Sequence, residues 1–200
     1  MKGTRNLTLL IVGGIILILF VWGCSGYNGL VKRDETVKNK WSDVQSSYQR
    51  RADLIPNLVA TVKGAAEFEK ETYTQVALAR AGQLKQAVKV PVDSLNTQRM
   101  QEIQKASKEA LDATRMAINI AVERYPDLKA TANFSGLQAQ LEGTENRINV
   151  TRDDFNAAVN SYNTKVRSFP TNIFASIMGF KKREGFAAQP GSDKAPEVKF

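Results

Sequence analysis

Apolar residues return at regular intervals between residues 37 and 62, with polar residues between them. Spacings of seven, with a second apolar position three or four residues away, are typical of a helix packed in a bundle. Pro56 interrupts the pattern, but Leu58 and Val62 keep its register. Because proline removes one backbone hydrogen bond without shifting that register, we expect a kink near residues 52–56 rather than a helix end. The apolar positions are Val37, Trp41, Val44, Tyr48, Ile55, Leu58 and Val62.

Three further helices are predicted at about residues 67–88, 94–125 and 134–169. Asp93 or Ser94 can cap the second of these, and Pro126 ends it because proline disfavours a helical conformation at the residue before. Four long helices with short connections predict an all-α fold, an antiparallel up-and-down four-helix bundle with coiled-coil-like helices. The clearest repeat is that of the last helix, with Leu137, Leu141, Thr144, Ile148, Phe155, Val159, Tyr162, Val166 and Phe169.

The N-terminal part of the chain has a different pattern, because Leu7 to Trp22 is almost wholly apolar. As a helix this stretch rises about 24 Å, and continued to Tyr27 it reaches about 31 Å, enough for a hydrocarbon core of roughly 30 Å. We therefore predict that residues 1–26 form an N-terminal transmembrane anchor, with Trp22 and Tyr27 in the membrane interface. Gly23, Gly26 and Gly29 then predict a joint before the bundle.

A second interpretation of the same segment is a lipoprotein export signal. Lys2 and Arg5 would be its positive region, and Val21-Trp22-Gly23-Cys24 resembles a bacterial lipobox that leaves a lipidated Cys24. Trp22 is bulky for that position, so we favour the uncleaved anchor, in which Cys24 is a small apolar residue of the membrane helix.

The charges on the two sides of the anchor give opposing signals about its orientation. Lys2 and Arg5 favour a cytoplasmic N-terminus, whereas Lys32, Arg33, Lys38 and Lys40 lie close on the other side. We favour an extracytoplasmic bundle.

Composition removes several classes of function. The net charge of +8 is spread along the helices, which favours attraction to anionic lipid or acidic partners over a nucleic-acid groove. The chain has no histidine and one cysteine, so the commonest metal ligand and general base are absent. No phosphate-binding loop, nucleophile elbow or metal-spaced cluster occurs, and no small-molecule substrate is evident. We expect neither an enzyme nor a cofactor or metal.

One face of the predicted fourth helix carries amides and acids at steps of three or four residues. Asparagine is a poorer helix former than Lys, Glu or Arg, so its repeated use on one face is unusual for a solvated surface. The alternatives are an ordinary solvated face or a hydrogen-bonding ladder to another helix or to a partner protein. The ladder consists of Glu142, Asn146, Asn149, Asp153, Asn156, Asn160 and Asn163.

A second polar cluster, Arg50, Arg51, Asp53 and Asn57, interrupts the first helix. Arg51 shares the register of Val44 and Leu58, so it should lie toward the core or a groove and needs a carboxylate. The candidates are Asp53, Glu142, Glu145 and Asp154. We favour an internal ion pair over a ligand site, and we hypothesise that this cluster and the ladder face each other or share a partner.

Residues 171–186 combine apolar side chains with Lys181, Lys182 and Arg183, a combination suited to the membrane interface. The alternative is that the aromatic residues of this segment pack on the bundle. Residues 187–200 have little apolar content and are predicted to be disordered.

Several runs together resemble the LemA family of bacterial membrane proteins, over about residues 27–186. The resemblance implies a single-pass N-terminal anchor in the bacterial cell membrane and a helical bundle over residues 27–170, with no established enzymatic activity or cofactor. The runs are Tyr27-Asn28-Gly29-Leu30-Val31, Trp41-Ser42-Asp43-Val44, Arg50-Arg51-Ala52-Asp53-Leu54-Ile55-Pro56-Asn57, Tyr125-Pro126-Asp127-Leu128, Glu142-Gly143-Thr144-Glu145-Asn146-Arg147 and Ser168-Phe169-Pro170.

These observations favour a membrane-anchored scaffold or adaptor that binds another membrane or envelope protein through the bundle. The alternative is a self-assembling structural or membrane-remodelling protein that acts on the lipid surface as a homo-oligomer.

Overall fold

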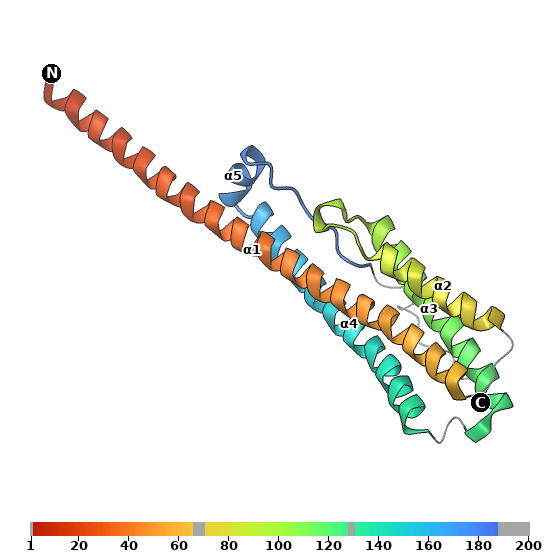
Figure 1. The fold of residues 1–200 in the computed structure, drawn as a ribbon. Helices are drawn as coiled ribbons and strands as arrows, with labels where there is room; N and C mark the ends of the chain where they lie inside the picture. The colour runs from red at the N-terminus through yellow and green to blue at the C-terminus, as the bar shows by residue number, and fades with distance from the viewer. Residues whose placement is uncertain (1, 66–70, 128–130, 188–200) are drawn as a thin grey trace, which may run out of the picture. The chain divides into compact units, whose positions relative to one another are not determined.

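The computed structural model describes residues 2–65, 71–127 and 131–187, and these form an all-α fold. The described residues contain no strand, as predicted. Within α1, most side chains before Gly23 lie outside the described part. The elements are α1 (Lys2–Ala65), α2 (Glu71–Ala87), the 3-10 helix η1 (Val92–Ser94), α3 (Thr97–Arg124), α4 (Ala132–Arg167) and α5 (Thr171–Ile177) (Figure 1).

The chain divides into two compact units. The first contains Met1–Asn39 and Ala157–Arg183, and the second contains Lys40–Asn156 and Glu184–Phe200. The first unit therefore holds the beginning of α1, the end of α4 and α5. The second unit holds the rest of α1 and α4 together with α2, η1 and α3.

Helix α1 is longer than predicted, because it begins at Lys2 and runs through the glycines to Ala65. The predicted joint at Gly23, Gly26 and Gly29 is wrong. In the first unit a Cβ atom at Gly23 would lie 3.1 Å from Cε1 of Phe174. Gly23 therefore does not end α1, and its missing side chain allows α5 to pack closely against α1. The helix also continues through Pro56, as predicted.

The apolar repeats of α1 and α4 predict the buried positions well. All seven apolar positions predicted between residues 37 and 62 are buried, and so are Leu141, Ile148, Phe155 and Tyr162 of α4. Leu137 is half-buried, and Phe169 is 79% exposed because α4 ends at Arg167 and the following turn takes Phe169 out of the helical register.

Helix α3 packs against α2, and its ends are set by local signals. The predicted cap at Asp93 or Ser94 is wrong, because both residues belong to η1. Asn96 caps α3 instead, its side-chain oxygen accepting a hydrogen bond of 2.8 Å from the backbone N–H of Arg99. The helix ends at Arg124, just before Tyr125-Pro126.

The link from η1 back to α1 is made by side chains of α1 in the second unit. The indole N–H of Trp41 donates to the carbonyl of Val90 at 2.8 Å, and Gln45 donates to the carbonyl of Val88 at 2.6 Å. These bonds hold the connection between α2 and α3 against α1.

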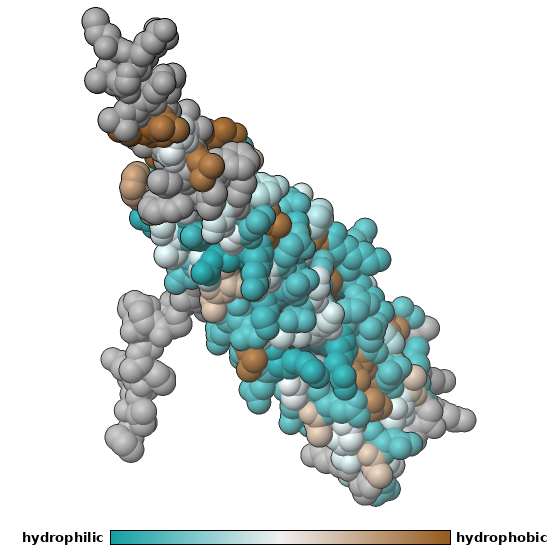
Figure 2. Space-filling view, turned by 90° about the vertical axis from the view of Figure 1, so that its left-hand side faces the viewer, coloured by the Kyte–Doolittle hydropathy of each residue, from teal (hydrophilic) through white to brown (hydrophobic). Residues whose placement is uncertain are grey.

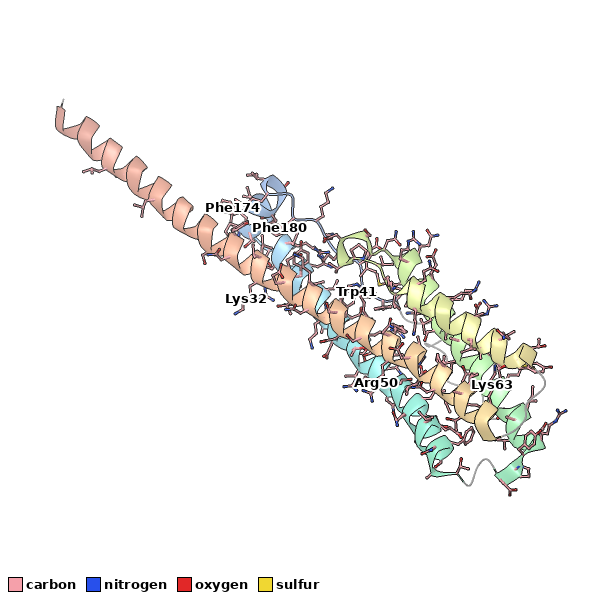
Figure 3. The ribbon with its side chains drawn as sticks, in the orientation of Figure 1. Lys32, Trp41, Arg50, Lys63, Phe174 and Phe180 are labelled. Carbon is pink, nitrogen blue, oxygen red and sulfur yellow. The ribbon has the colours of Figure 1, made fainter. Side chains whose placement is uncertain are left out.

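In the first unit, α5 lies against α1 (Figure 1). Phe174 packs on Gly23, and the ring of Phe180 lies edge-on to that of Tyr27 with centroids 6.0 Å apart. Figure 3 shows these two phenylalanines on the side of α5 and its following segment that faces α1. Phe174 and Phe180 therefore face α1, whereas Ile173, Ile177 and Met178 of the same segment are exposed.

The transmembrane anchor predicted over residues 1–26 has no support from the part of the chain that the structure describes, in which no helix is both long and apolar enough to cross a membrane.

Candidate groove between α1 and α4

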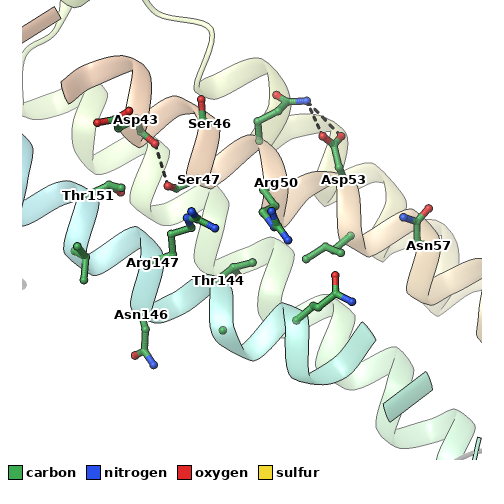
Figure 4. Close-up of a pocket in the computed structure, with 15 residues that line it drawn as sticks. Asp43, Ser46, Ser47, Arg50, Asp53, Asn57, Thr144, Asn146, Arg147 and Thr151 are labelled. Carbon is green, nitrogen blue, oxygen red and sulfur yellow. Dashed lines mark hydrogen bonds between the residues drawn. The ribbon is translucent and has the colours of Figure 1, made fainter. Parts of the chain in front are cut away.

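A groove of about 1230 Å³ lies between α1 and α4 in the second unit. Residues between 43 and 57 of α1 form one wall, and residues between 140 and 151 of α4 form the other (Figure 4). Most of the lining side chains are hydroxyls and amides, whereas Leu54 and Val150 add apolar surface. Both walls therefore carry polar side chains, of which the hydroxyls of Ser47, Thr144 and Thr151 donate to backbone carbonyls of their own helices.

The groove carries equal numbers of acids and arginines, but the acids have cations beside them. It is lined by two acids, Asp43 and Asp53, and by two arginines, Arg50 and Arg147. Lys85 lies 2.5 Å from the carboxylate of Asp53. Lys40 lies 3.5 Å from that of Asp43, and its closer partner is Asp154 on α4 at 2.7 Å, one of the candidate carboxylates for Arg51. Both acids therefore already have cations beside them.

Within the described residues, neither Arg50 nor Arg147 forms an ion pair with a carboxylate. Figure 4 shows Arg50 on α1 and Arg147 on α4 extending into the space between the two helices. A guanidinium binds a carboxylate through two parallel hydrogen bonds, which makes it the preferred side chain for such recognition. The arrangement is suited to holding an acidic group between the two walls.

Arg51 ties the groove to the core beneath it. Its guanidinium donates to Glu145 at 2.5 Å, to Ser107 at 2.7 Å and to Thr144 at 3.0 Å. The Arg51 side chain is 3% exposed, whereas that of Glu145 is 48% exposed. Because Thr144 also lines the groove, the position of the α4 wall depends on this buried network.

Tyr48 is buried in the same region. Removal of its hydroxyl from water raises the pKa of Tyr48 to about 12, against the weaker opposing effect of the cations Arg152 and Arg51. The phenol therefore stays neutral at physiological pH.

The polar cluster of α1 and the ladder of α4 meet at one point only. Arg50, Asp53 and Asn57 line the groove, and Asn146 is the ladder residue that lines it with them. Asn149, Asp153 and Asn160 are exposed elsewhere on α4. Their role as partner-binding residues stays a prediction.

Asn156 and Asn163 bind the backbone of the C-terminal segment of the same chain. In the second unit Asn156 donates to the carbonyl of Phe186 at 3.1 Å and accepts from its N–H at 2.8 Å. In the first unit Asn163 donates to the carbonyl of Arg183 at 2.8 Å and accepts from its N–H at 2.9 Å. These two side-chain amides are therefore occupied by the fold itself.

Phe186 fills an aromatic pocket in the second unit. Its ring centroid lies 5.8 Å from that of Phe155 and 6.3 Å from that of Trp41, and the guanidinium carbon of Arg152 lies 4.8 Å from it. Phe186 is 6% exposed. This agrees with the alternative that aromatic residues of 171–186 pack on the bundle, but sequence analysis did not single out Phe186, because the segment around it has no periodic pattern.

The residues predicted to contact the membrane have different environments. Lys181 and Lys182 are exposed, but Arg183 donates to Asp34 at 2.7 Å and lies over the ring of Tyr162. Arg183 is therefore held by the first unit. Tyr27 packs on Phe180, whereas the side chains of Trp22 and Cys24, and residues 188–200 of the predicted tail, lie outside the described part of the chain.

Arg147 was also missed by sequence analysis. It directly follows the ladder residue Asn146, but an exposed arginine on a helix is ordinary, and its position opposite Arg50 depends on how α1 and α4 pack. No group of three or more His, Cys, Asp or Glu residues in the described ranges could hold a metal ion.

Comparison with known proteins points to one family. The chain is 25% identical over 121 residues to Protein LemA of Metamycoplasma hominis, which covers 60% of this chain and 50% of that protein. The chain thus spans about half the length of this relative. The LemA family model matches residues 40–200, which include both walls of the groove and the C-terminal segment bound by Asn156. On this match the chain belongs to the LemA family.

Proposed function

We propose that this chain is a membrane-anchored scaffold or adaptor that binds an acidic segment of another membrane or envelope protein in the α1–α4 groove. The observation that carries the proposal is the pair of arginines, Arg50 and Arg147, on opposite walls, beside acids that already have cations. An acidic side chain of the partner would supply the carboxylate with which Arg50 and Arg147 are not paired in the described chain.

The shape and chemistry of the groove favour a protein segment over a small metabolite. Hydroxyls and amides continue along both walls beyond the arginines, and Val150, which is 60% exposed, gives an apolar contact. A groove of this kind suits a peptide that places acidic residues between the arginines and an apolar residue on Val150. With no histidine in the chain, we infer binding without catalysis.

The rest of the proposal concerns how the groove is presented. We infer that α1 to α4 form an antiparallel up-and-down bundle and that residues 7–22 anchor it in a bacterial cell membrane. The uncharged, apolar composition of this stretch and the LemA family membership support the anchor. We propose an extracytoplasmic position for the groove, where it meets envelope proteins.

A defined peptide tests the groove directly. The probe is a fluorescent peptide of alternating glutamate and leucine, compared with the same peptide carrying glutamine in place of glutamate, added to the full chain in detergent micelles. We expect the acidic peptide to bind more tightly and its affinity to fall with salt. The double variant Arg50→Gln with Arg147→Gln should weaken binding by at least about tenfold, since hydrogen bonds to charged groups contribute about 1.5–3 kcal/mol each.

A matched control separates the groove from net charge. Arg115→Gln with Arg124→Gln removes two exposed arginines from α3, outside the groove. Equal loss of binding in the two double variants would show that the peptide is attracted by general charge, and the groove would then not be the site.

A further inference from the structure

Helix α5 has a defined position along α1 within the first unit. Phe174 packs on Gly23, and a Cβ atom at Gly26 would lie 3.9 Å from the hydroxyl of Thr171. Helix α5 therefore docks on the first two turns of α1 after the apolar stretch that ends at Trp22. The part of α1 that precedes Gly23 continues past α5 as a single helix (Figure 1).

The outward side of α5 is unusually apolar for an exposed surface. Phe174 is turned toward Gly23, and Thr171 and Ala175 are buried. By contrast, Ile177 is 76% exposed, Met178 is 52% exposed and Ile173 is 51% exposed, and the preceding Phe169 is 79% exposed. On the face seen in Figure 2, brown apolar surface gathers near the N-terminal end of the chain, whereas the remainder is largely hydrophilic.

Cations stand directly after this apolar surface. Lys181 and Lys182 are exposed. The neighbouring Arg183 is fixed by Asp34 at 2.7 Å, and its backbone is held by Asn163. Tyr162 donates to the carbonyl of Lys181 at 3.0 Å. The backbone that carries the two lysines is therefore held in place beside α5.

We propose that α5 and the two lysines form a second membrane contact, in which Ile173, Ile177 and Met178 enter the interface of an anionic bilayer and Lys181 and Lys182 meet its headgroups. Apolar side chains flanked by lysines are the combination that binds an anionic interface. The inference rests on the proposed anchor, because docking at Gly23 and Gly26 places α5 where an anchor of residues 7–22 would leave the membrane.

The test measures the depth of single positions in lipid. Full chains with Cys24→Ser carry one new cysteine, at Ile177, at Leu17 of the apolar stretch or at the exposed Val150 of the groove, and each is labelled with an environment-sensitive fluorophore. The chains are reconstituted in vesicles of phosphatidylcholine and phosphatidylglycerol that contain nitroxide lipids, spin-labelled either at the headgroup or at mid-chain. A label at Ile173, also exposed on α5, serves as a second reporter if the Ile177 variant disturbs the fold.

We expect headgroup nitroxides to quench the labels at Ile177 and Ile173, mid-chain nitroxides to quench the label at Leu17, and neither to quench the label at Val150. Lys181→Gln with Lys182→Gln, or omission of phosphatidylglycerol, should reduce the quenching at Ile177 toward that at Val150. Unchanged quenching after both changes would overturn the assignment of the lysines to anionic headgroups.

The two proposals fail in different ways. If Leu17 is quenched while Ile177 and Ile173 behave like Val150, the contact of α5 is wrong and the anchor stands. If Leu17 is not quenched by mid-chain nitroxides, the anchor is wrong and the contact of α5 falls with it.

Discussion

Asn156 and Phe186 exchange two hydrogen bonds, the amide nitrogen donating to the Phe186 carbonyl at 3.1 Å and the amide oxygen accepting from the Phe186 N–H at 2.8 Å. The Asn156 side chain thus gives the backbone of Phe186 both a donor and an acceptor, as a neighbouring β-strand would. The contact is independent of the side chain at residue 186, which is held separately by the rings of Trp41 and Phe155.

The first prediction concerns this pair of bonds. Asn156→Asp keeps the acceptor for the Phe186 N–H but replaces the donor with a second acceptor facing the carbonyl. We expect the segment around Phe186 to loosen by about 1–2 kcal/mol, the usual effect of leaving a partly buried polar group without its partner. Hydrogen exchange at the Phe186 amide measures the change.

Asn160→Asp is the matched control, since Asn160 is exposed on the same helix. It makes the same chemical change and should leave exchange at Phe186 unaltered. Similar acceleration in both variants would mean that the amide pairing contributes nothing specific.

A second prediction concerns the Arg51–Glu145 ion pair. Glu145→Ala leaves a buried guanidinium without its carboxylate, while its bonds to Ser107 and Thr144 remain. We expect the free energy of unfolding to fall by about 1–3 kcal/mol, less than for a fully buried pair because Glu145 is 48% exposed. Urea denaturation measures the loss.

Glu142→Ala provides the comparison on the same helix, because Glu142 is exposed and its carboxylate accepts a hydrogen bond from Gln138 at 3.1 Å. We expect a change within about 0.5 kcal/mol. Equal destabilisation by the two substitutions would show that the ion pair of Glu145 with Arg51 does not stabilise the fold.

Tyr48 predicts a loss of stability in alkali. Burial raises its pKa to about 12 from 10.0, so the folded protein keeps the phenolic proton to a higher pH than the unfolded chain. The resulting stabilisation is complete below pH 10 and is lost as the pH rises toward about 12, with a slope of at most about 1.4 kcal/mol per unit. Urea denaturation at about pH 9 and about pH 11 measures the loss, and Tyr48→Phe should show a smaller one. An equal loss in wild type and variant would contradict this assignment.

Two glycines predict opposite effects of adding a side chain. At Gly82 in α2 an added Cβ atom meets nothing within 4 Å, so Gly82→Ala should raise the free energy of unfolding by about 0.5–1 kcal/mol. At Gly23 the added atom would lie 3.1 Å from Phe174, so Gly23→Val should displace α5. Denaturation tests the first substitution, and hydrogen exchange at Met178, whose N–H bonds to Phe174, tests the second. Unchanged exchange would show that α5 does not depend on the close approach.

Local patterns predict the helices and their buried faces because helical periodicity is a property of neighbouring residues. Val44, Tyr48 and Ile55 are buried because their spacing places them on one face of α1. The same local reasoning failed at Gly23, where a residue that usually weakens a helix serves a contact with Phe174, 151 positions away in the chain.

The groove was only partly predictable, for a related reason. The polar cluster of α1 stood out because Arg50 and Arg51 interrupt an apolar repeat. Arg147 did not stand out, since its significance comes from Arg50 on the opposite wall. Similarly, the unusual asparagine content of α4 was visible, but the backbone that two of the asparagines bind belongs to a segment without periodicity.

When a helix with a seven-residue apolar repeat shifts by seven residues along its neighbours, the same apolar positions still face them. Apolar packing alone therefore discriminates poorly between alternative registers of the packed helices. Arg51 breaks that symmetry, because it occupies the position that Val44 and Leu58 occupy one repeat earlier and later. Any slipped alignment would leave a charge among apolar side chains, far from Ser107, Thr144 and Glu145. We therefore expect the Arg51 guanidinium to specify the register of α1 relative to α3 and α4. That register keeps the two walls of the groove opposite each other.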